Sequence, residues 1–248
     1  MRNVAIVIAM AAVAAAAYGD WGQVVSSFPA PGSQPGGLTF DGTYVWYADY
    51  ARDFRTVYKL TTTGSFSGQW RVNWGYAVGL AWDGTYLWSD ALSARYVYKM
   101  NPANCSVLNS FYGPSGHMMG MGCDGDYLYI NDWQDRRVAR VSFTGSLRQL
   151  IPVLAPSPSG VAIQGNYLWY STRDYFTPAN AKCIKALKSN GSAVASFQSP
   201  DSQATDLGIQ GNYLWVSGFT TKTIYKVDVT PPSAVTPTSL GKVKTLFR

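Results

Sequence analysis

The sequence contains no glutamate and only one histidine, His117. All 14 acidic residues are therefore aspartates, against 20 lysines and arginines, and charged residues make up only 14% of the 248 positions. Any mechanism that needs a glutamate, or two histidines from one chain, is excluded. The low charge and the 15% of aromatic residues also exclude a disordered chain, which would be more charged and less aromatic.

Long apolar runs are equally scarce, and the one that exists lies at the start of the chain. Arg2 precedes an apolar run over residues 4–17, and Ala17 and Gly19 place small residues where a signal peptidase reads. This pattern predicts a signal peptide at residues 1–19, cut before Asp20; a retained membrane anchor and a buried helix are the alternatives. We expect the mature chain to be secreted, periplasmic or at the cell surface, without membrane insertion after cleavage.

The charge and the C-terminal segment say less about partners. Cleavage lowers the formal charge from +6 to +5, and the basic residues are dispersed, which does not predict a nucleic-acid partner. Residues 231–248 read as a linker rich in proline and serine, followed by a short basic tail with Lys242, Lys244 and Arg248. A sorting or docking tail and a frayed terminus are both open.

The strongest signal is a unit that occurs five times between residues 20 and 230. Asp41-Gly42-Thr43-Tyr44-Val45-Trp46 returns four times in related form, twice with glutamine in place of the aspartate. The tyrosines of the five copies are spaced 42, 41, 40 and 46 residues apart: Tyr44, Tyr86, Tyr127, Tyr167 and Tyr213. Four short strands fit each copy: a small-residue strand such as 37–40, the Tyr-Leu-Trp strand, a strand such as 56–60 with a basic fourth residue, and an alternating strand such as 192–197.

The fifth copy lacks its fourth strand, because Pro231 and Pro232 interrupt it. Residues 22–28 match residues 191–197 nearly position for position, so we expect the N-terminal segment to supply that strand and to close a ring. The sequence therefore predicts an all-β fold, a five-bladed β-propeller of four-stranded blades, over residues 20–230. A linear stack of β units is the alternative, which the shared terminal blade argues against.

Segments such as residues 79–90 resemble the repeats of exported bacterial β-propellers of the broad NHL, YVTN and YncE-like kind. The resemblance covers nearly the whole mature chain. It implies the propeller fold and an exported protein, and it does not imply one activity, because this fold hosts many functions.

Residues that recur in every copy are expected to build the blades. The Asp-Gly pairs suit tight turns, and the recurring strand-three lysine or arginine is interpreted as solvated or packed along its stem. We expect the aromatic residue that ends each Tyr-Leu-Trp run to pack between neighbouring blades: Trp46, Trp88, Tyr129, Trp169 and Trp215.

The three cysteines show no zinc-type spacing, and all three cannot pair within one chain. Cys123 and Cys183 replace apolar residues of the template, which predicts two buried thiols. Cys105 replaces a turn glycine, which predicts an exposed thiol. We expect no disulfide.

Candidate site residues come from the segments in which the copies differ, namely the loops from strand four to the next strand one and from strand two to strand three. These loops should share one face of the propeller. Aromatic rings beside arginine and aspartate there suit the binding of sugars or extended peptides; plugging of the loops by these rings is the alternative. The predicted binding residues are Trp70, Arg71, Trp74, Tyr76, Tyr112, His117, Trp133, Arg136, Arg173, Tyr175 and Phe219.

We therefore predict a monomeric, non-catalytic binding or surface-interaction propeller, without cofactor or metal, that contacts a glycan, peptide or protein. The alternative is a hydrolase or lyase that uses aspartates, since two aspartates can serve as acid and nucleophile. Five-bladed propeller glycosidases use aspartate and glutamate, and propeller lyases similar to the streptogramin lyases need histidine, glutamate and a metal; this chain lacks both sets. No motif of the plant-type glutaminyl cyclases is evident. The aspartates to check are Asp49, Asp53, Asp90, Asp132, Asp135 and Asp174.

Overall fold

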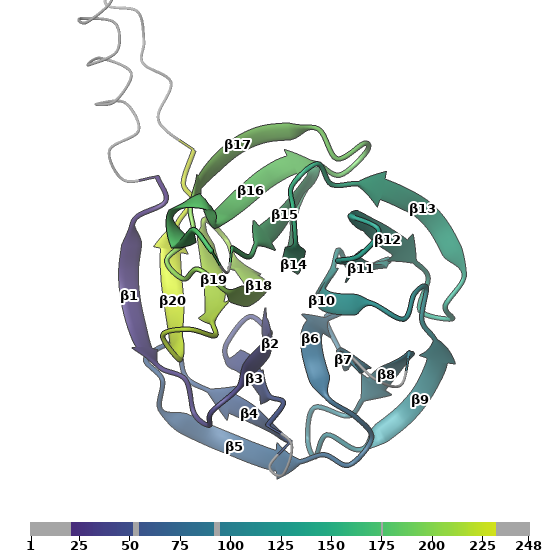
Figure 1. Ribbon diagram of the computed structural model, residues 1–248. Helices are drawn as coiled ribbons and strands as arrows, with labels where there is room; N and C mark the ends of the chain where they lie inside the picture. The colour runs from purple at the N-terminus through teal and green to yellow at the C-terminus, as the bar shows by residue number, and fades with distance from the viewer. Residues whose placement is uncertain (1–20, 52–54, 92–94, 175, 232–248) are drawn as a thin grey trace, which may run out of the picture.

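The computed structural model describes residues 21–51, 55–91, 95–174 and 176–231. These residues form twenty β-strands and a short 3-10 helix, η1 (Pro178–Asn180). The strands make five antiparallel sheets of four, arranged as blades in a ring (Figure 1). The predicted all-β, five-bladed propeller is thus confirmed. The predicted signal peptide, the basic tail, Asp53 and Tyr175 lie outside the described residues.

Each blade runs from an inner strand at the axis to an outer strand at the rim. Blade 1 contains β2 (Pro35–Phe40), β3 (Val45–Asp49), β4 (Thr56–Leu60) and β5 (Phe66–Arg71). Blade 2 contains β6 (Ala77–Trp82), β7 (Leu87–Ala91), β8 (Tyr96–Met100) and β9 (Val107–Tyr112). Blade 3 contains β10 (Met118–Cys123), β11 (Leu128–Asp132), β12 (Arg137–Val141) and β13 (Leu147–Pro152). Blade 4 contains β14 (Pro158–Gln164), β15 (Tyr167–Thr172), β16 (Lys182–Leu187) and β17 (Ala193–Gln198).

Blade 5 combines segments from both ends of the ring. It contains β18 (Ala204–Gln210), β19 (Tyr213–Gly218) and β20 (Thr223–Asp228), and its outer strand is β1 (Val24–Pro29). β1 pairs antiparallel with β20, with Phe28 opposite Ile224. The inner strand β18 also contacts β2, the inner strand of blade 1. The segment that follows the predicted signal peptide therefore completes the last blade.

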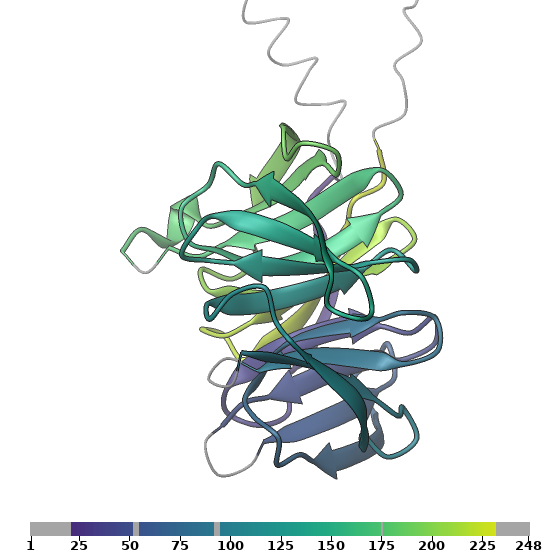
Figure 2. The ribbon, with the colours of Figure 1, turned by 90° about the vertical axis from the view of Figure 1, so that its right-hand side faces the viewer.

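Two faces result from this topology. We call the loop face the one formed by the connections from each outer strand to the next inner strand and by the loops between the second and third strands. The connection that carries η1 projects from this face in the side view (Figure 2). The tight hairpins between the first two strands, and between the last two, form the opposite face, called here the hairpin face. Within the described ranges, no helix is long and apolar enough to cross a membrane.

The hydrophobic core lies between the blades rather than inside one layer. Each aromatic residue at the end of a Tyr-Leu-Trp run is buried in a cluster shared with the next blade, as predicted. Trp88, for example, packs with Met121 and Leu128 of blade 3 and is 1% exposed. Burial of five such rings supplies much of the driving force for holding the blades together.

The turn residue that opens each repeat also binds the aromatic residue of its own blade. Asp41 accepts hydrogen bonds from the amides of Thr43 and Tyr44, which confirms the predicted turn role. Its second oxygen accepts the indole N–H of Trp46 at 2.7 Å. Gln164 and Gln210 accept the corresponding indole N–H groups in blades 4 and 5 at 3.0 and 3.1 Å. The glutamines of the later repeats are therefore functional equivalents of the aspartates as acceptors.

The recurring basic residue of the third strand has a partner that the sequence did not reveal. In all five blades its charged group lies over the ring of the repeat tyrosine, at 3.7 to 4.2 Å from the ring centre. Lys59 over Tyr44 is one example. The interpretation as a solvated or stem-packed side chain missed this cation–π contact, which adds attraction across each blade.

The axis is occupied by one carboxylate. Four inner strands carry glycine at the point where they approach the axis, and β18 carries Asp206 there. A side chain on Gly160 would lie 2.5 Å from the Asp206 backbone, and one on Gly120 would lie 2.3 Å from a Ser159 carbonyl. The inner strands are therefore too close to admit more than one side chain at this level.

Backbone amides from all four other blades converge on the Asp206 carboxylate. Each inner strand shifts register against its neighbour at or just before the glycine or aspartate. The amides of Leu38 and Leu80 donate to one carboxylate oxygen at 3.0 and 2.9 Å. Those of Met121 and Val161 donate to the other at 3.3 and 3.2 Å.

The same carboxylate has no described cation beside it. Complete burial raises the pKa of Asp206 well above its ordinary value, and the amide hydrogen bonds oppose that rise. The partial positive charges of converging amides form an anion-binding nest of the kind that successive N–H groups make. Asp206 thus ties blade 5 to the other four through hydrogen bonds alone.

The cysteines agree with the predicted absence of a disulfide, since all three are free. Cys183 is buried, as predicted, and Cys123 is half-buried. The prediction of an exposed Cys105 was wrong. The turn that carries it lies over blade 1, so the side chain packs into the cluster around Trp46 and is only 4% exposed. Its backbone keeps the left-handed conformation (φ 54°) of the glycine it replaces.

We expect the native thiols to be unreactive. Burial raises the pKa of Cys105, Cys123 and Cys183 to about 12 each, so that almost no thiolate exists at pH 8. A thiol reagent should therefore react with three groups in denaturant and with none rapidly in the native protein, and any slow native reaction should disappear in Cys123→Ser. A fast native reaction, or fewer than three thiols in denaturant, would contradict this description.

Removal of the axial carboxylate should severely destabilise the ring. Asp206→Ala leaves four buried amides without an acceptor, at about 1–3 kcal/mol each, so we expect little folded protein. Asp206→Asn keeps one acceptor oxygen and should lose less free energy of unfolding in guanidinium titrations. The control is Asp126→Asn, an exposed turn residue whose carboxylate makes no hydrogen bond within the described residues. Equal stability of Asp206→Ala and the control would refute this role.

Candidate ligand-binding face

Residues at the start of each inner strand and the end of each second strand meet on the loop face. Backbone hydrogen bonds join Trp133 to His117, Arg173 to Ser157, Phe219 to Gln203 and Tyr50 to Gln34. Each pair lies one residue beyond the paired first and second strands of its blade, at their loop-face end. The pairs therefore surround the loop-face end of the axis. Tyr76 precedes β6 at the same position in blade 2. We call the resulting set the mouth ring: Tyr50, Tyr76, His117, Trp133, Arg173 and Phe219.

The mouth ring brings together five of the predicted binding residues and one that the sequence did not single out, Tyr50. The ring of Tyr50 stacks on Phe219 across the boundary between blades 1 and 5, with 6.2 Å between ring centres. The Arg55 guanidinium lies 4.2 Å from the centre of the Tyr76 ring. A rule that selects the residue after each Tyr-Leu-Trp strand would have found Tyr50.

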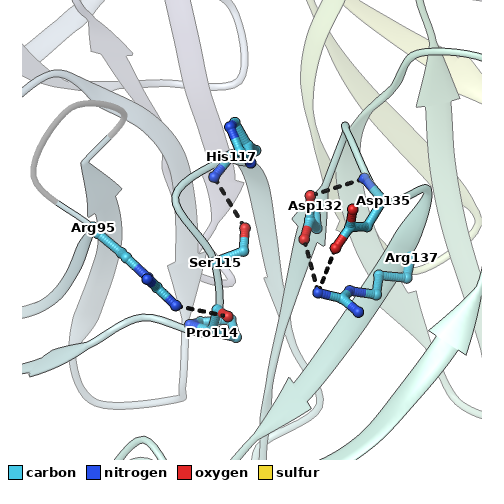
Figure 3. A network of polar contacts seen from close by, with 7 residues as sticks. All are labelled: Arg95, Pro114, Ser115, His117, Asp132, Asp135 and Arg137. Atoms are coloured by element: carbon cyan, nitrogen blue, oxygen red, sulfur yellow. Dashed lines mark hydrogen bonds and ion pairs between the residues drawn. The ribbon is translucent and has the colours of Figure 1, made fainter.

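Trp133 is the most exposed residue of the mouth ring, and it lies against His117. Their rings make an edge-to-face contact at 5.6 Å, and Trp133 is 41% exposed. The backbone N–H of His117 donates to the Ser115 hydroxyl at 3.0 Å, which fixes the loop before β10 (Figure 3). An indole that is 41% exposed suits stacking against a flat apolar surface of a ligand.

A charged cluster lies beside these two rings. Arg137 contacts Asp132 at 3.3 Å and Asp135 at 2.6 Å through the same nitrogen (Figure 3). Asp132 is buried and also accepts the Asp135 amide, whereas Asp135 is exposed. Asp135 and Arg137 therefore offer polar groups within the same loop as Trp133.

Two predicted residues pack into the core between blades 1 and 2. Trp70 stacks on Trp46 with ring centres 5.5 Å apart, and Trp74 lies against Tyr98 at 4.7 Å. Both belong to the margin of the same buried cluster. For these two side chains the structure favours a packing role, which the sequence analysis gave as the alternative to ligand binding.

Two predicted residues lie at the rim of the loop face. Tyr112 ends β9, is 58% exposed and has the Arg95 guanidinium 4.6 Å from its ring centre. Arg136 is exposed in the tight β11–β12 loop, and its carbonyl accepts the Val153 amide. Neither lies in the mouth ring.

Arg71 lines a separate pocket of about 500 Å³ on the flank of blade 1. Asp49, Tyr58 and Gln69 also line it. The Asp49 carboxylate is occupied there by three backbone amides, those of Ser33, Gln34 and Ala51. It therefore shapes the loop rather than offering a free charge to a ligand.

The other aspartates considered as acids have similar structural partners. Asp174 is half-buried and caps the loop before η1 by accepting the amides of Phe176 and Thr177, and these hydrogen bonds lower its pKa. Asp132 and Asp135 come close together, but they share Arg137. Both carboxylates are ion-paired with one guanidinium, and Asp132 is buried, whereas the acid of a glycosidase must reach its substrate. Among the described residues, no group of three histidine, cysteine or acidic side chains could hold a metal ion.

Asp90 differs from these aspartates, because it is buried and one of its carboxylate oxygens has no hydrogen-bond partner within the described residues. One oxygen accepts the Gly79 amide at 2.6 Å, and the other has no hydrogen-bond partner within the described residues. Burial raises the pKa of Asp90 to about 7, against the opposing effect of the amide hydrogen bonds. The side chain is 0% exposed, so it cannot contact a ligand without movement of the inner strands.

Comparisons with known proteins agree with the fold. No protein-family model matches the chain, and no curated protein matches it in sequence. Among solved structures, glutaminyl cyclase from Myxococcus xanthus aligns with a TM-score of 0.70 and 12% identity, over 85% of this chain and 97% of the other. A chain of a nidogen/laminin complex aligns with a TM-score of 0.58 and 13% identity, over 79% of this chain and 77% of the other. At such identities the likeness shows the propeller fold alone.

The pH dependence of stability should report Asp90. Its pKa is about 3.8 in the unfolded chain and about 7 in the folded one, so the folded state binds the extra proton between these values. Stability should therefore be highest near pH 4 and fall as the pH rises to 7, by up to about 4 kcal/mol. Thermal unfolding of Asp90→Asn between pH 5 and 8 should show a smaller fall than the wild type.

The control for that comparison is Asp126→Asn, which should keep the wild-type profile. Asp206 has a raised pKa in the same core and contributes a pH dependence of the same sign, so the difference between wild type and Asp90→Asn is the informative quantity. Identical profiles for the two would show that Asp90 does not carry the proton.

Proposed function

We propose that this protein is an exported, non-catalytic binding propeller whose mouth ring binds a glycan. The observation that carries the proposal is the half-exposed indole of Trp133, held by His117 and flanked by Asp135 and Arg137. Aromatic rings bind the apolar faces of sugars while nearby charged groups bind the hydroxyls. The export part rests on the apolar segment at residues 4–17 with its small residues at positions 17 and 19.

The use of aspartates on the loop face supports binding over catalysis. Asp49, Asp132 and Asp174 accept backbone amides that hold the loops, and Asp90 is inaccessible. An acid catalyst must instead reach the substrate with its proton available. A hydrolase that uses Asp132 and Asp135 is the second candidate, because their contacts with one Arg137 nitrogen bring the two carboxylates close together.

Replacement of Trp133 should weaken glycan binding. Wild-type protein would be screened on glycan and peptide arrays, and affinities for the hits would be measured by calorimetry with wild type and Trp133→Ala. We expect a loss of about tenfold or more, because buried aromatic anchors dominate such interfaces. The matched control is Phe66→Ala, which removes a 63% exposed aromatic ring from β5, away from the mouth ring.

Several outcomes would decide against the proposal. Hits confined to the peptide array would replace the glycan with a peptide ligand. Unchanged affinity in Trp133→Ala would remove the mouth ring as the binding site. Hydrolysis of a bound glycan that is lost in Asp135→Asn would favour the hydrolase.

A further inference from the structure

One boundary between blades departs from the repeat on the hairpin face. Between blades 2 and 3, Phe143 of the β12–β13 turn stacks on Trp88 with ring centres 5.3 Å apart. Between blades 3 and 4, Lys188 takes the place of that phenylalanine and Tyr129 takes the place of the tryptophan. The two turns correspond in place, since the residue before Phe143 and the residue before Lys188 both accept the amide of the turn glycine, and the turn of blade 4 is one residue longer.

These two replacements exchange an aromatic contact for a polar one. Lys188 pairs with Asp124 at 2.8 Å, and its ammonium lies 5.7 Å from the centre of the Tyr129 ring. The Tyr129 hydroxyl donates to the same Asp124 oxygen at 2.7 Å. The smaller ring and the thin lysine chain fill less space than tryptophan and phenylalanine do at the neighbouring boundary.

A pocket of about 600 Å³ opens at this boundary. Its volume falls in the range of small-molecule sites. The lining includes Tyr129, Arg140, Gln149, Asn166, Lys188 and Ser189. The residues come from β11, β12 and β13 of blade 3 and from two hairpins of blade 4, so the pocket spans both blades. It lies on the opposite face from the mouth ring and does not depend on the proposed function.

The charges around the pocket leave one cation unbalanced. Asp124 offsets Lys188: partial burial raises the pKa of Asp124, but hydrogen bonds from Lys188 and Tyr129 outweigh burial and hold it below the ordinary value. The Arg140 guanidinium makes no hydrogen bond or ion pair within the described residues and lies 3.8 Å from the centre of the Tyr127 ring. Its Nε is buried without a hydrogen-bond partner there.

Arginine is also the exception at its position. The other four blades have lysine at this position. The lysine ammonium lacks the additional Nε–H donor that the arginine guanidinium carries. Burial of a charged group's N–H donor without an acceptor is unfavourable. An anion bound in the pocket would supply an acceptor for the Arg140 Nε. With Arg140, Lys188 and Asp124 the local formal charge is +1, which matches a single negative charge better than two.

We propose that this pocket binds a small, singly charged carboxylate that also carries hydroxyl groups, such as a sugar acid. Arg140 and Lys188 would contact the carboxylate. Asn166 and Ser189 supply the neutral donors and acceptors that hydroxyl groups need, and Tyr129 supplies a ring.

The experiment titrates the full-length protein with glucuronate, glucose and glucose 6-phosphate by calorimetry. The proposal expects saturable binding of glucuronate and at least about tenfold weaker binding of neutral glucose, because the charge-assisted hydrogen bonds would be lost. Glucose that binds as well as glucuronate would overturn the proposal, as would the absence of glucuronate binding. Tighter binding of the phosphate would overturn the assignment to a singly charged ligand.

Variants that copy the boundary between blades 2 and 3 give the sharpest test. Tyr129→Trp combined with Lys188→Phe rebuilds the Trp88–Phe143 arrangement and should fold while abolishing glucuronate binding. Arg140→Gln is the second variant, should the double variant fail to fold, and should weaken glucuronate binding by about tenfold or more. The matched control, Lys185→Gln, removes the equivalent cation from blade 4 and should bind like the wild type. Wild-type affinity in Arg140→Gln would overturn the proposal.

Discussion

The ring depends on a single carboxylate beside which the described residues place no positive side chain. Asp206 projects from the inner strand of blade 5 and accepts an amide from each of the other four blades. The same register shift in every inner strand presents these amides, so the repeat provides the donors and the one exceptional residue provides the acceptor. The glycines at the equivalent positions are then required because the strands meet around a side chain that already fills the axis.

Much of the fold could be predicted from the sequence because its determinants recur. Five copies of one motif fix the number of blades, and the aromatic residue in each copy indicates where neighbouring blades pack. The match between residues 22–28 and 191–197 indicated which strand completes the fifth blade. The role of Asp206 could not be predicted in this way. In the sequence Asp206 is only an exception at a position that is otherwise glycine. The four amides that donate to it lie 45 to 168 residues away from it along the chain.

The candidate site was predictable in part, for a related reason. The loops that differ among repeats do supply the mouth ring, but membership of a loop does not tell which side chains face solvent. Trp70 and Trp74 lie in or beside such a loop and still pack into the core, because rings of that size lower the free energy most when they are buried. Tyr50 was missed because its place in the mouth ring depends on stacking against Phe219 of blade 5, which is distant in the sequence. The pocket between blades 3 and 4 required knowledge that Tyr129 and Lys188 face each other across two blades.

The pairing of β1 with β20 has a consequence for the order in which the molecule assembles. The first strand of the ring finds its partner only in the last repeat, almost 200 residues later. Such a contact has a very high contact order, and loop-closure entropy opposes it until the intervening blades have formed. The first four blades can therefore condense in sequence from local hairpins, whereas blade 5 is completed only when the two ends of the ring meet. The stability of blade 5 is therefore coupled to closure of the whole ring.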